Sequence, residues 1–506
     1  MKSSPIARNY TEFLERPIRG KNHPGIDMSA AHPSKEPRPH PPSPSIARKF
    51  LYLLGARGFR ETLGAVFFIL LARKSTVLFG EFMLALSMGY LLRIAADFGL
   101  NQFLVPRLSR KASNAPLLLQ VSLLKGALFL VVWTAGLFFL SSQAYATQLR
   151  HVMVIIAAGV GLEVFANTFF VVLQVRGRQG TEGMIKSLAA FLGFGYGIVM
   201  LAAGFSPRVV AFFKIIETII FLVFSSGWAF KAYRARPMKP SLAGVVLILP
   251  QVLVFGLIDV FSVATAKINL FFLQHHGGSD GVGQYSAPWE LVDGITLLVL
   301  ELLLQSVLYP VFARLWLLER KQAAVVAREA FRWLMAAALV ISAVLFMESD
   351  RLIPLIYGPG YPDAVWLQKL LVLTVALTFL QYFCSFLMMS MGQERRLLLY
   401  YGIVLLVNIL LCRILIPGNP LQGSAWSIIG TKAVVALLTV SHCHVQVRLI
   451  PGRSLIQLGG VCALSAVVFF SGRGWIRREL VECFTVLPMI GLIGAWWTRG
   501  GRHHAA

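Results

Sequence analysis

The sequence predicts an all-α polytopic membrane protein with about 14 transmembrane helices. Three observations lead to this fold class: 57% of the 506 residues are hydrophobic, only 14% are charged, and the apolar residues gather into long blocks. A helix needs about 20 residues to cross the hydrocarbon core, whereas a barrel strand needs about ten. The blocks have the length of helices, and a water-soluble globule is excluded.

The apolar blocks follow one another closely between residues 51 and 498. Short polar loops separate them, and none of these loops is long enough to fold as a separate catalytic domain. The predicted spans are 51–72, 79–103, 116–140, 152–173, 184–204, 209–230, 243–266, 286–309, 330–348, 366–391, 397–416, 421–441, 455–471 and 481–498.

The first 48 residues differ from the rest of the chain. They contain nine prolines, and nine Lys or Arg are found up to Lys49, but there is no continuous apolar stretch. This composition predicts a disordered basic, proline-rich tail and not a secretory leader.

Positive charge is distributed unevenly between the two sets of loops. If the tail is cytoplasmic, 28 Lys and Arg lie on its side of the membrane and 9 lie on the other side. Because basic loops favour the cytoplasmic side, both termini are predicted to be cytoplasmic. The formal net charge of +24 is therefore spread between the spans, which argues against a nucleic-acid partner.

Two parts of the chain repeat one another at a nearly constant offset. FGEF at residue 79 matches VGQY at residue 282, and LVPRLSR matches LYPVFAR further along. The matched pairs are Gly80 with Gly283, Pro106 with Pro310 and Arg110 with Arg314. Because six helices separate the repeats, we expect two pseudo-symmetric six-helix bundles related by an axis along the membrane normal. The predicted parts are the tail (1–48), the bundles (49–240 and 241–446), and two terminal helices with a short cytoplasmic tail (447–506).

The repeated segments carry a family resemblance. FGEFMLALSMGYLLRIAADFGLNQFLVPRLSR resembles the second-helix signature of bacterial polysaccharide flippases, with a Gly-aromatic start, an Asp-x-Gly-Leu element and a basic loop. VGQYSAPWELVDGITLLVLELLLQSVLYPVFAR is similar to its counterpart in the second half, and LIPLIYGPGYPDA resembles the loop after helix 9. These flippases belong to the multidrug/oligosaccharidyl-lipid/polysaccharide exporter superfamily, and the resemblance covers residues 50–440.

This resemblance implies a two-lobed fold in the bacterial inner membrane. The implied activity is the movement of undecaprenyl-pyrophosphate-linked sugars from the cytoplasmic to the periplasmic leaflet. The implied partners are the lipid-linked oligosaccharide, the membrane lipids, a polysaccharide polymerase and its chain-length machinery. One position departs from the family, because Asn269 stands where many relatives carry an acidic residue.

The first apolar block carries charge near its middle. Counted from Lys49 at about 1.5 Å per residue, Arg57 and Arg60 lie ~12 Å and ~16 Å along a core of about 30 Å. An arginine that faces lipid there costs at least ~2.5 kcal/mol. We therefore expect both to line a hydrated cavity and to bind the pyrophosphate through their forked donors. The alternatives are snorkelling to the headgroups and a pair between Arg57 and Glu61.

Later spans carry further charged residues. Arg93, Lys125 and Lys432 are predicted to join the two arginines in substrate binding, although Arg93 and Asp97 could equally form a self-contained ion pair. Lys214 and Glu217 suggest a structural pair. The predicted gating or ion-coupling residues are Glu61, Asp97, Glu163, Asp259, Glu290 and Asp293.

Four of the charged residues are expected to gather toward the outer end of helices 7 and 8. They are Asp259, Lys267, Glu290 and Asp293. Three roles are open for this group: an exit gate, a site for a coupling cation, or contact with lipid headgroups.

Neither a metal nor a cofactor is predicted. The five cysteines form no CxxC motif, and neither His275–His276 nor HCH at 442–444 places ligands on one helix face. The chain has no Walker motif. Export is therefore expected to use an ion gradient, the membrane potential or consumption of the product outside.

Three functions remain to be weighed. The first is a flippase that moves lipid-linked oligosaccharide by alternating access for surface or exopolysaccharide biosynthesis. The second is a cation-coupled multidrug antiporter of the same superfamily, which predicts an acidic cavity, whereas the mid-membrane charges lean basic. The third is a membrane polysaccharide polymerase or ligase, which needs a large periplasmic loop, whereas the longest candidate, 267–285, is short. The flippase is the prediction, and no enzymatic activity is expected.

Overall fold

The computed structural model describes residues 46–110, 115–233, 242–300, 312, 316, 320–449, 452–472 and 477–503. Within these residues the regular elements are all α-helices. They are α2 (Ile46–Lys74), α3 (Thr76–Asp97), α4 (Leu100–Arg110), α5 (Ala115–Ser142), α6 (Thr147–Val175), α7 (Gln179–Ala202), α8 (Pro207–Tyr233), α9 (Leu242–Leu300), α11 (Arg320–Met347), α12 (Ser349–Tyr357), α13 (Pro362–Leu371), α14 (Leu373–Ser390), α15 (Glu394–Leu415), α16 (Pro420–Val447), α17 (Gly452–Gly472) and α18 (Arg478–His503).

Ten helices in the described part of the chain are long and apolar enough to cross a membrane. One of them, α9, is two helices that meet at Gly278, where φ is 65° and ψ is −174°. Glycine suits this turn because it has no Cβ to clash at positive φ. The chain folds back there, since Asn269 donates a hydrogen bond of 2.9 Å to the Tyr285 hydroxyl. The helices confirm the predicted all-α polytopic membrane fold.

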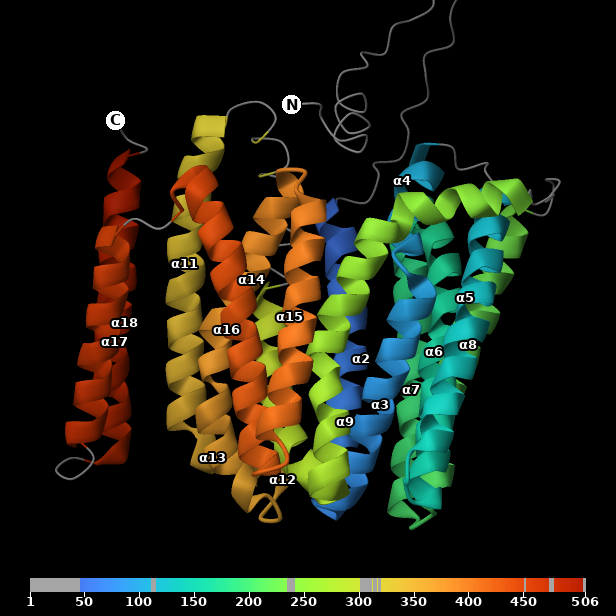
Figure 1. Ribbon diagram of the computed structural model, residues 1–506, viewed down its shortest axis with the longest axis horizontal. Coiled ribbons are helices and arrows are strands. Elements are labelled where there is room, and N and C mark those ends of the chain that lie inside the picture. The colour runs from blue at the N-terminus through green and yellow to red at the C-terminus, as the bar shows by residue number, and fades with distance from the viewer. Residues whose placement is uncertain are drawn as a thin grey trace, which may run out of the picture.

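Two groups of helices stand side by side in Figure 1. The first lobe comprises α2, α3 and α5 to α8, which pack against one another. The second lobe comprises α11 and α13 to α16, with α9 packed against α13 to α16 on one side and α3 on the other. The pair α17–α18 lies beside α11 at the edge (Figure 1). The predicted boundary near residue 240 lies among residues 234–241, outside the described part, and stays a prediction, as does the tail.

The ends of the helices define two faces of the molecule. α2 begins and α18 ends at the upper face of Figure 1, and α4 also lies there. The turn after α2 and the turn between α12 and α13 lie at the lower face. The described part of the chain therefore begins and ends on the same side of the molecule (Figure 1).

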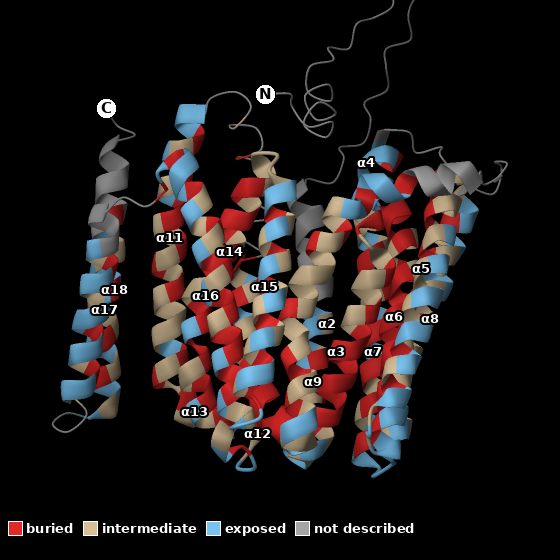
Figure 2. Cartoon of the chain, in the orientation of Figure 1, coloured by how far each residue is buried: buried red, intermediate tan, exposed pale blue. Residues whose placement is uncertain are grey.

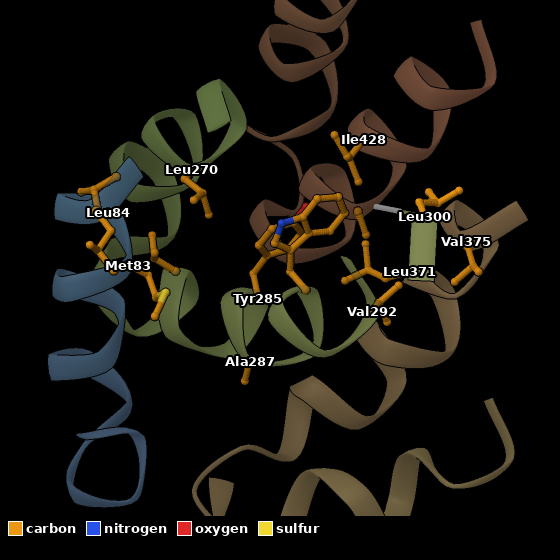
Figure 3. Packing of buried hydrophobic residues seen from close by; sticks show 14 of the residues in the cluster. Met83, Leu84, Leu270, Tyr285, Ala287, Val292, Leu300, Leu371, Val375 and Ile428 are labelled. Carbon is orange, nitrogen blue, oxygen red and sulfur yellow. The ribbon is translucent and has the colours of Figure 1, made fainter. Parts of the chain in front are cut away.

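Buried residues gather where the helices face one another, and exposed residues follow the outer surfaces (Figure 2). Large apolar side chains such as Phe138 and Leu406 are exposed on the outside, as contact with lipid tails demands. The main apolar cluster crosses from one lobe to the other. Figure 3 shows Met83 and Leu84 of α3 beside Leu270 and Tyr285 of α9.

The two glycines matched by the repeat meet near the lower face. A Cβ on Gly80 would lie 1.9 Å from the carbonyl oxygen of Ser279 and 2.7 Å from the nitrogen of Gly283. A Cβ on Gly283 would lie 2.2 Å from the carbonyl oxygen of Thr76. Only glycine allows α3 and the second arm of α9 to approach this closely. The repeat therefore marks a contact between the lobes.

Hydrogen bonds join the lobes at both faces. At the lower face, Arg73 donates to the carbonyl oxygen of Ile356 at 2.9 Å, and the Tyr361 hydroxyl donates to that of Ala72 at 3.1 Å. In the upper half, Gln102 of α4 donates to Asp259 of α9 at 3.0 Å. The structure thus shows the lobes in contact above and below the middle of the molecule.

Candidate functional site

Five charged side chains form one network in the middle of the first lobe. Glu163 of α6 is its centre: it receives Arg60 at 3.4 Å and Arg93 at 3.2 Å, and it also pairs with Lys214. Glu217 receives Arg60 at 2.8 Å and Lys214 at 2.7 Å. Four helices therefore contribute to the network: α2, α3, α6 and α8.

The network carries one net positive charge, because it holds three cations and two carboxylates. Both carboxylates are buried, with 5% of the Glu163 side chain and none of the Glu217 side chain exposed. Arg60 and Arg93 keep 28% and 35% of their side chains exposed. At about 1.5 Å per residue, Arg60 lies ~21 Å from the lower end of α2, which is mid-span. The exposed part of the network is therefore cationic and deep in the membrane.

A chain of contacts leads from this network to α9. The Arg93 guanidinium lies over the Tyr90 ring at 5.1 Å, and the Lys267 ammonium lies near the same ring at 5.9 Å. Lys267 in turn lies 3.9 Å from Glu290. The Glu290 side chain is 45% exposed at this position, so the meeting point of α3 and the two arms of α9 leaves accessible space beside it. Arg93 thus faces the region between the lobes.

Arg93 and Asp97 do not form the self-contained pair that their spacing suggested. Asp97 instead accepts a hydrogen bond of 2.5 Å from Lys125, whose side chain is fully buried. Asn101 and Thr168 accept from the same ammonium at 2.8 Å and 2.7 Å. The prediction fails because neighbouring helices supply other partners: Glu163 of α6 pairs with Arg93, and Lys125 of α5 pairs with Asp97. Lys125 has all three donors occupied, which makes it a structural residue in this conformation.

The second lobe contains a smaller ion pair at a similar depth. Lys432 of α16 lies 3.2 Å from Asp293 of α9 and donates to the Thr378 hydroxyl at 2.6 Å. Its ammonium also lies 5.0 Å from the Trp289 ring. Only 9% of the lysine side chain is exposed. Lys432 lies on the last helix of the second lobe, α16, and Lys214 lies on the last helix of the first lobe, α8. Each lobe therefore directs a lysine of its last helix inward.

The expected cluster at the outer end of helices 7 and 8 is wrong in its placement. Asp259 lies in the upper half, where it meets Gln102. Glu290 and Asp293 lie ~18 Å and ~22 Å along α9 from Gly278, which is mid-span. The cause is the position of the turn in α9. The first arm was predicted to end at residue 266 but continues to 277, and the second arm was predicted to begin at residue 286 but begins at 279. Glu290 and Asp293 therefore lie away from the ends of the helices, which disfavours contact with lipid headgroups for these two carboxylates.

Two predicted residues of α2 receive no support. The Arg57 side chain lies outside the described part of the structure. Glu61 is exposed, and its gating or ion-coupling role stays a prediction. Lys214 and Glu217 form the expected pair, but they also belong to the larger network. Two charged residues on one face of a membrane-spanning helix could have predicted that Lys214 and Glu217 join a larger buried network.

The sequence of this chain matches a known protein family. A family model described as "Polysaccharide biosynthesis protein" matches residues 46–316, which is more than half of the chain. The chain belongs to the polysaccharide biosynthesis protein family. The match includes α2, α3, α6 and α8, which carry the charged network of the first lobe. No curated protein matches the chain.

Solved structures share the fold of this polysaccharide biosynthesis family member. The lipid II flippase MurJ in an inward closed conformation has a TM-score of 0.66 at 13% identity. The alignment covers 90% of this chain and 100% of the MurJ chain. An inward-facing multidrug resistance MATE transporter of the MOP superfamily has a TM-score of 0.58 at 17% identity, covering 77% and 94%. A MOP superfamily transporter from Pyrococcus furiosus has a TM-score of 0.53 at 18% identity, covering 80% and 94%.

Proposed function

We propose that this protein flips a polyprenyl-pyrophosphate-linked oligosaccharide across the bacterial inner membrane by alternating access. The family match and the fold shared with a lipid II flippase support the class of activity. The observation that carries the choice of cargo is the network with one net positive charge in the first lobe. Its exposed members, Arg60 and Arg93, are the groups that would meet the pyrophosphate.

The chemistry of these arginines fits a pyrophosphate diester. A guanidinium keeps its proton at any physiological pH and offers a planar fork of donors to two phosphate oxygens. Arg93 uses Nη1 for Glu163, and its remaining nitrogens have no partner among the described residues. Glu163 and Glu217 hold the arginines in place and lower the cost of keeping their charge in the membrane. One unbalanced positive charge then remains to attract an anion.

Alternating access follows from the contacts at the two faces. Release of the lower contacts, including the one between Gly80 and Gly283, would open the molecule below, and release of the pair Gln102–Asp259 would open it above. Cargo would enter from the upper face, which we place in the cytoplasm with both termini because of the basic loops. A polymerase and its chain-length machinery would then consume the cargo outside.

Substitution of Arg93 tests the proposal. We expect Arg93→Gln to cut the initial rate of flipping by about 10- to 150-fold, because a hydrogen bond to a charged group contributes about 1.5–3 kcal/mol. The measurement is the accumulation of lipid-linked oligosaccharide on the cytoplasmic leaflet in cells that carry only the variant. Arg93→Lys should restore part of the rate, and Arg208→Gln, which changes an exposed arginine at the lower end of α8, should not alter it.

A multidrug antiporter is the competing function, and the same cells distinguish it. Flipping that stays normal in Arg93→Gln, at normal abundance of the protein, would refute the role of the network. Loss of resistance to cationic dyes without any accumulated lipid-linked sugar would favour the antiporter.

A further inference from the structure

A small cavity lies between the lobes at the lower face, apart from the charged network. Its volume is about 160 Å³. The first lobe contributes Glu81 of α3, the loop 144–146 and Leu149 of α6. The residues on either side of the Gly278 turn complete the wall with Gln274, His275 and Ser279. The cavity therefore touches Ser279, whose carbonyl oxygen is in contact with Gly80.

Glu81 is the group that makes this cavity a binding site. Only 6% of Glu81 is exposed, and one carboxylate oxygen accepts a hydrogen bond of 3.2 Å from Gln148. The other oxygen accepts none from a described residue. Glu81 lines the cavity, and its second oxygen is open to a ligand, so a molecule that donates hydrogen bonds there would satisfy a carboxylate that is otherwise costly to bury.

The repeat shows that the fold does not require this cavity. At the offset that relates Gly80 to Gly283, Glu81 corresponds to Gln284. The amide of Gln284 donates to the carbonyl oxygen of Gly360 at 2.9 Å, and Gly360 lies in the loop that precedes α13. In the first lobe, the corresponding loop 144–146 leaves open space beside Glu81. The two halves therefore share the helix contact but differ in the space next to it.

The other wall residues suit a polyhydroxylated ligand. Gln274 accepts a hydrogen bond of 3.3 Å from the Ser279 hydroxyl, and its amide group is left to donate. Burial raises the pKa of Tyr145 to about 12, so its hydroxyl stays protonated and its ring offers an apolar face. Carboxylate, amide, hydroxyl and aromatic ring together match the alternating polar and apolar surfaces of a sugar.

The size of the cavity limits the ligand further. A water molecule needs about 10–15 Å³ of such volume, so the cavity holds on the order of ten waters. That space fits a single pyranose ring, and it is smaller than the ~300–1,000 Å³ of pockets that take drug-sized molecules. A bare alkali cation would leave most of it filled with water.

We propose that this cavity, lined by Glu81, Gln274 and Ser279, binds one monosaccharide unit of the cargo at the lower face. The inference rests on the proposed flippase function, and it adds a saccharide subsite about which the arginine network says nothing. Because Ser279 also borders the contact with Gly80, a bound sugar touches the closure through which the cargo would leave. The subsite would select among sugars just before release.

Binding of free monosaccharides to the purified full-length protein in nanodiscs tests this proposal without any transport. The probes are a panel of neutral hexoses, N-acetylhexosamines, amino sugars and uronic acids, followed by saturation-transfer difference NMR. We expect at least one class to bind, and Glu81→Gln to weaken that binding at least tenfold. Glu329→Gln removes an exposed carboxylate of α11 and serves as the matched control.

Two results would overturn the subsite. One is binding of no sugar, or equal binding by Glu81→Gln, in protein whose thermal melting is unchanged. The other is Glu81-dependent binding of radioactive sodium without any sugar signal, which would make the cavity a cation site. Failure of the flippase function is a separate result, because Arg93→Gln should lose flipping while its binding of monosaccharides stays normal.

Discussion

Replacement of Gly80 by alanine should shift the protein toward a conformation open at the lower face. The added Cβ would lie 1.9 Å from the carbonyl oxygen of Ser279 and 2.7 Å from the nitrogen of Gly283. Both atoms belong to the backbone of α9, so no side chain can rotate away. In the proposed alternating-access cycle, separation of the lobes at the lower face would relieve this overlap.

The size of the shift follows from known costs of overpacking. Insertion of a methyl group into a packed interface costs about 1–3 kcal/mol, which corresponds to a change of about 5- to 150-fold in the ratio of closed to open molecules. Alanine also stabilises a helix interior by about 0.5–1 kcal/mol relative to glycine. That gain applies to the open and closed states alike, so it leaves the conformational ratio unchanged.

Distances between spin labels measure the opening directly. Labels on Ser206→Cys and Gly418→Cys would report on the lower ends of the two lobes, because both residues are exposed in loops there. The exposed Cys462 and Cys483 must first be replaced by serine. We expect Gly80→Ala to populate a longer distance and to slow flipping.

A control variant separates the closure from a general effect of alanine. A Cβ on Gly195 of α7 would meet no atom within 4 Å, so Gly195→Ala should keep the original distances and activity. Unchanged distances in Gly80→Ala, together with normal flipping, would show that the glycine contact does not control the lower face.

Two further predictions concern ion pairs. Lys125→Ala should destabilise the protein by about 3–5 kcal/mol, because it leaves Asp97, whose side chain is only 16% exposed, without its cation. The thermal midpoint in detergent measures this, and the double variant Lys125→Met with Asp97→Leu should recover most of the loss. A midpoint unchanged in the single variant would contradict the pairing. A hydrogen bond from Arg478 holds the pKa of Asp350 below its usual range. The lowered pKa makes this pair stabilising above the ordinary pKa of about 3.9, and the contribution is lost as the pH falls through the lower, folded-state pKa. The thermal midpoint of the wild-type protein should therefore fall more steeply below about pH 5 than that of Asp350→Asn, and equal slopes would count against the pair.

The membrane fold could be predicted from the sequence because the bilayer imposes its own length and polarity on each span. The same constraint made several charged residues stand out, since a mid-span charge is rarely left in lipid. Lys125, Glu163 and Lys432 are buried as that argument expects. The repeated glycines were also visible as a pattern, although their contact with one another was not.

The partners of these charges depended on the tertiary structure. Arg93 pairs with Glu163, and Asp97 pairs with Lys125, although the spacing within α3 allowed the two to pair with each other. The choice is made by the rotation and depth of neighbouring helices, which bring distant residues closer than residues one turn apart.

The sequence by itself determined the fold class, the order of the spans and the presence of cationic groups at bilayer depth, because these depend on local hydrophobicity and length. The tertiary structure alone decided where the carboxylates of α9 lie. Residues 267–285 were the longest predicted outer loop, yet they form helix on both sides of Gly278. Close packing against α3 at Gly80 stabilises these helices beyond the ends that the sequence predicted. That continuation moves Glu290 and Asp293 from the expected outer edge into the middle of the membrane.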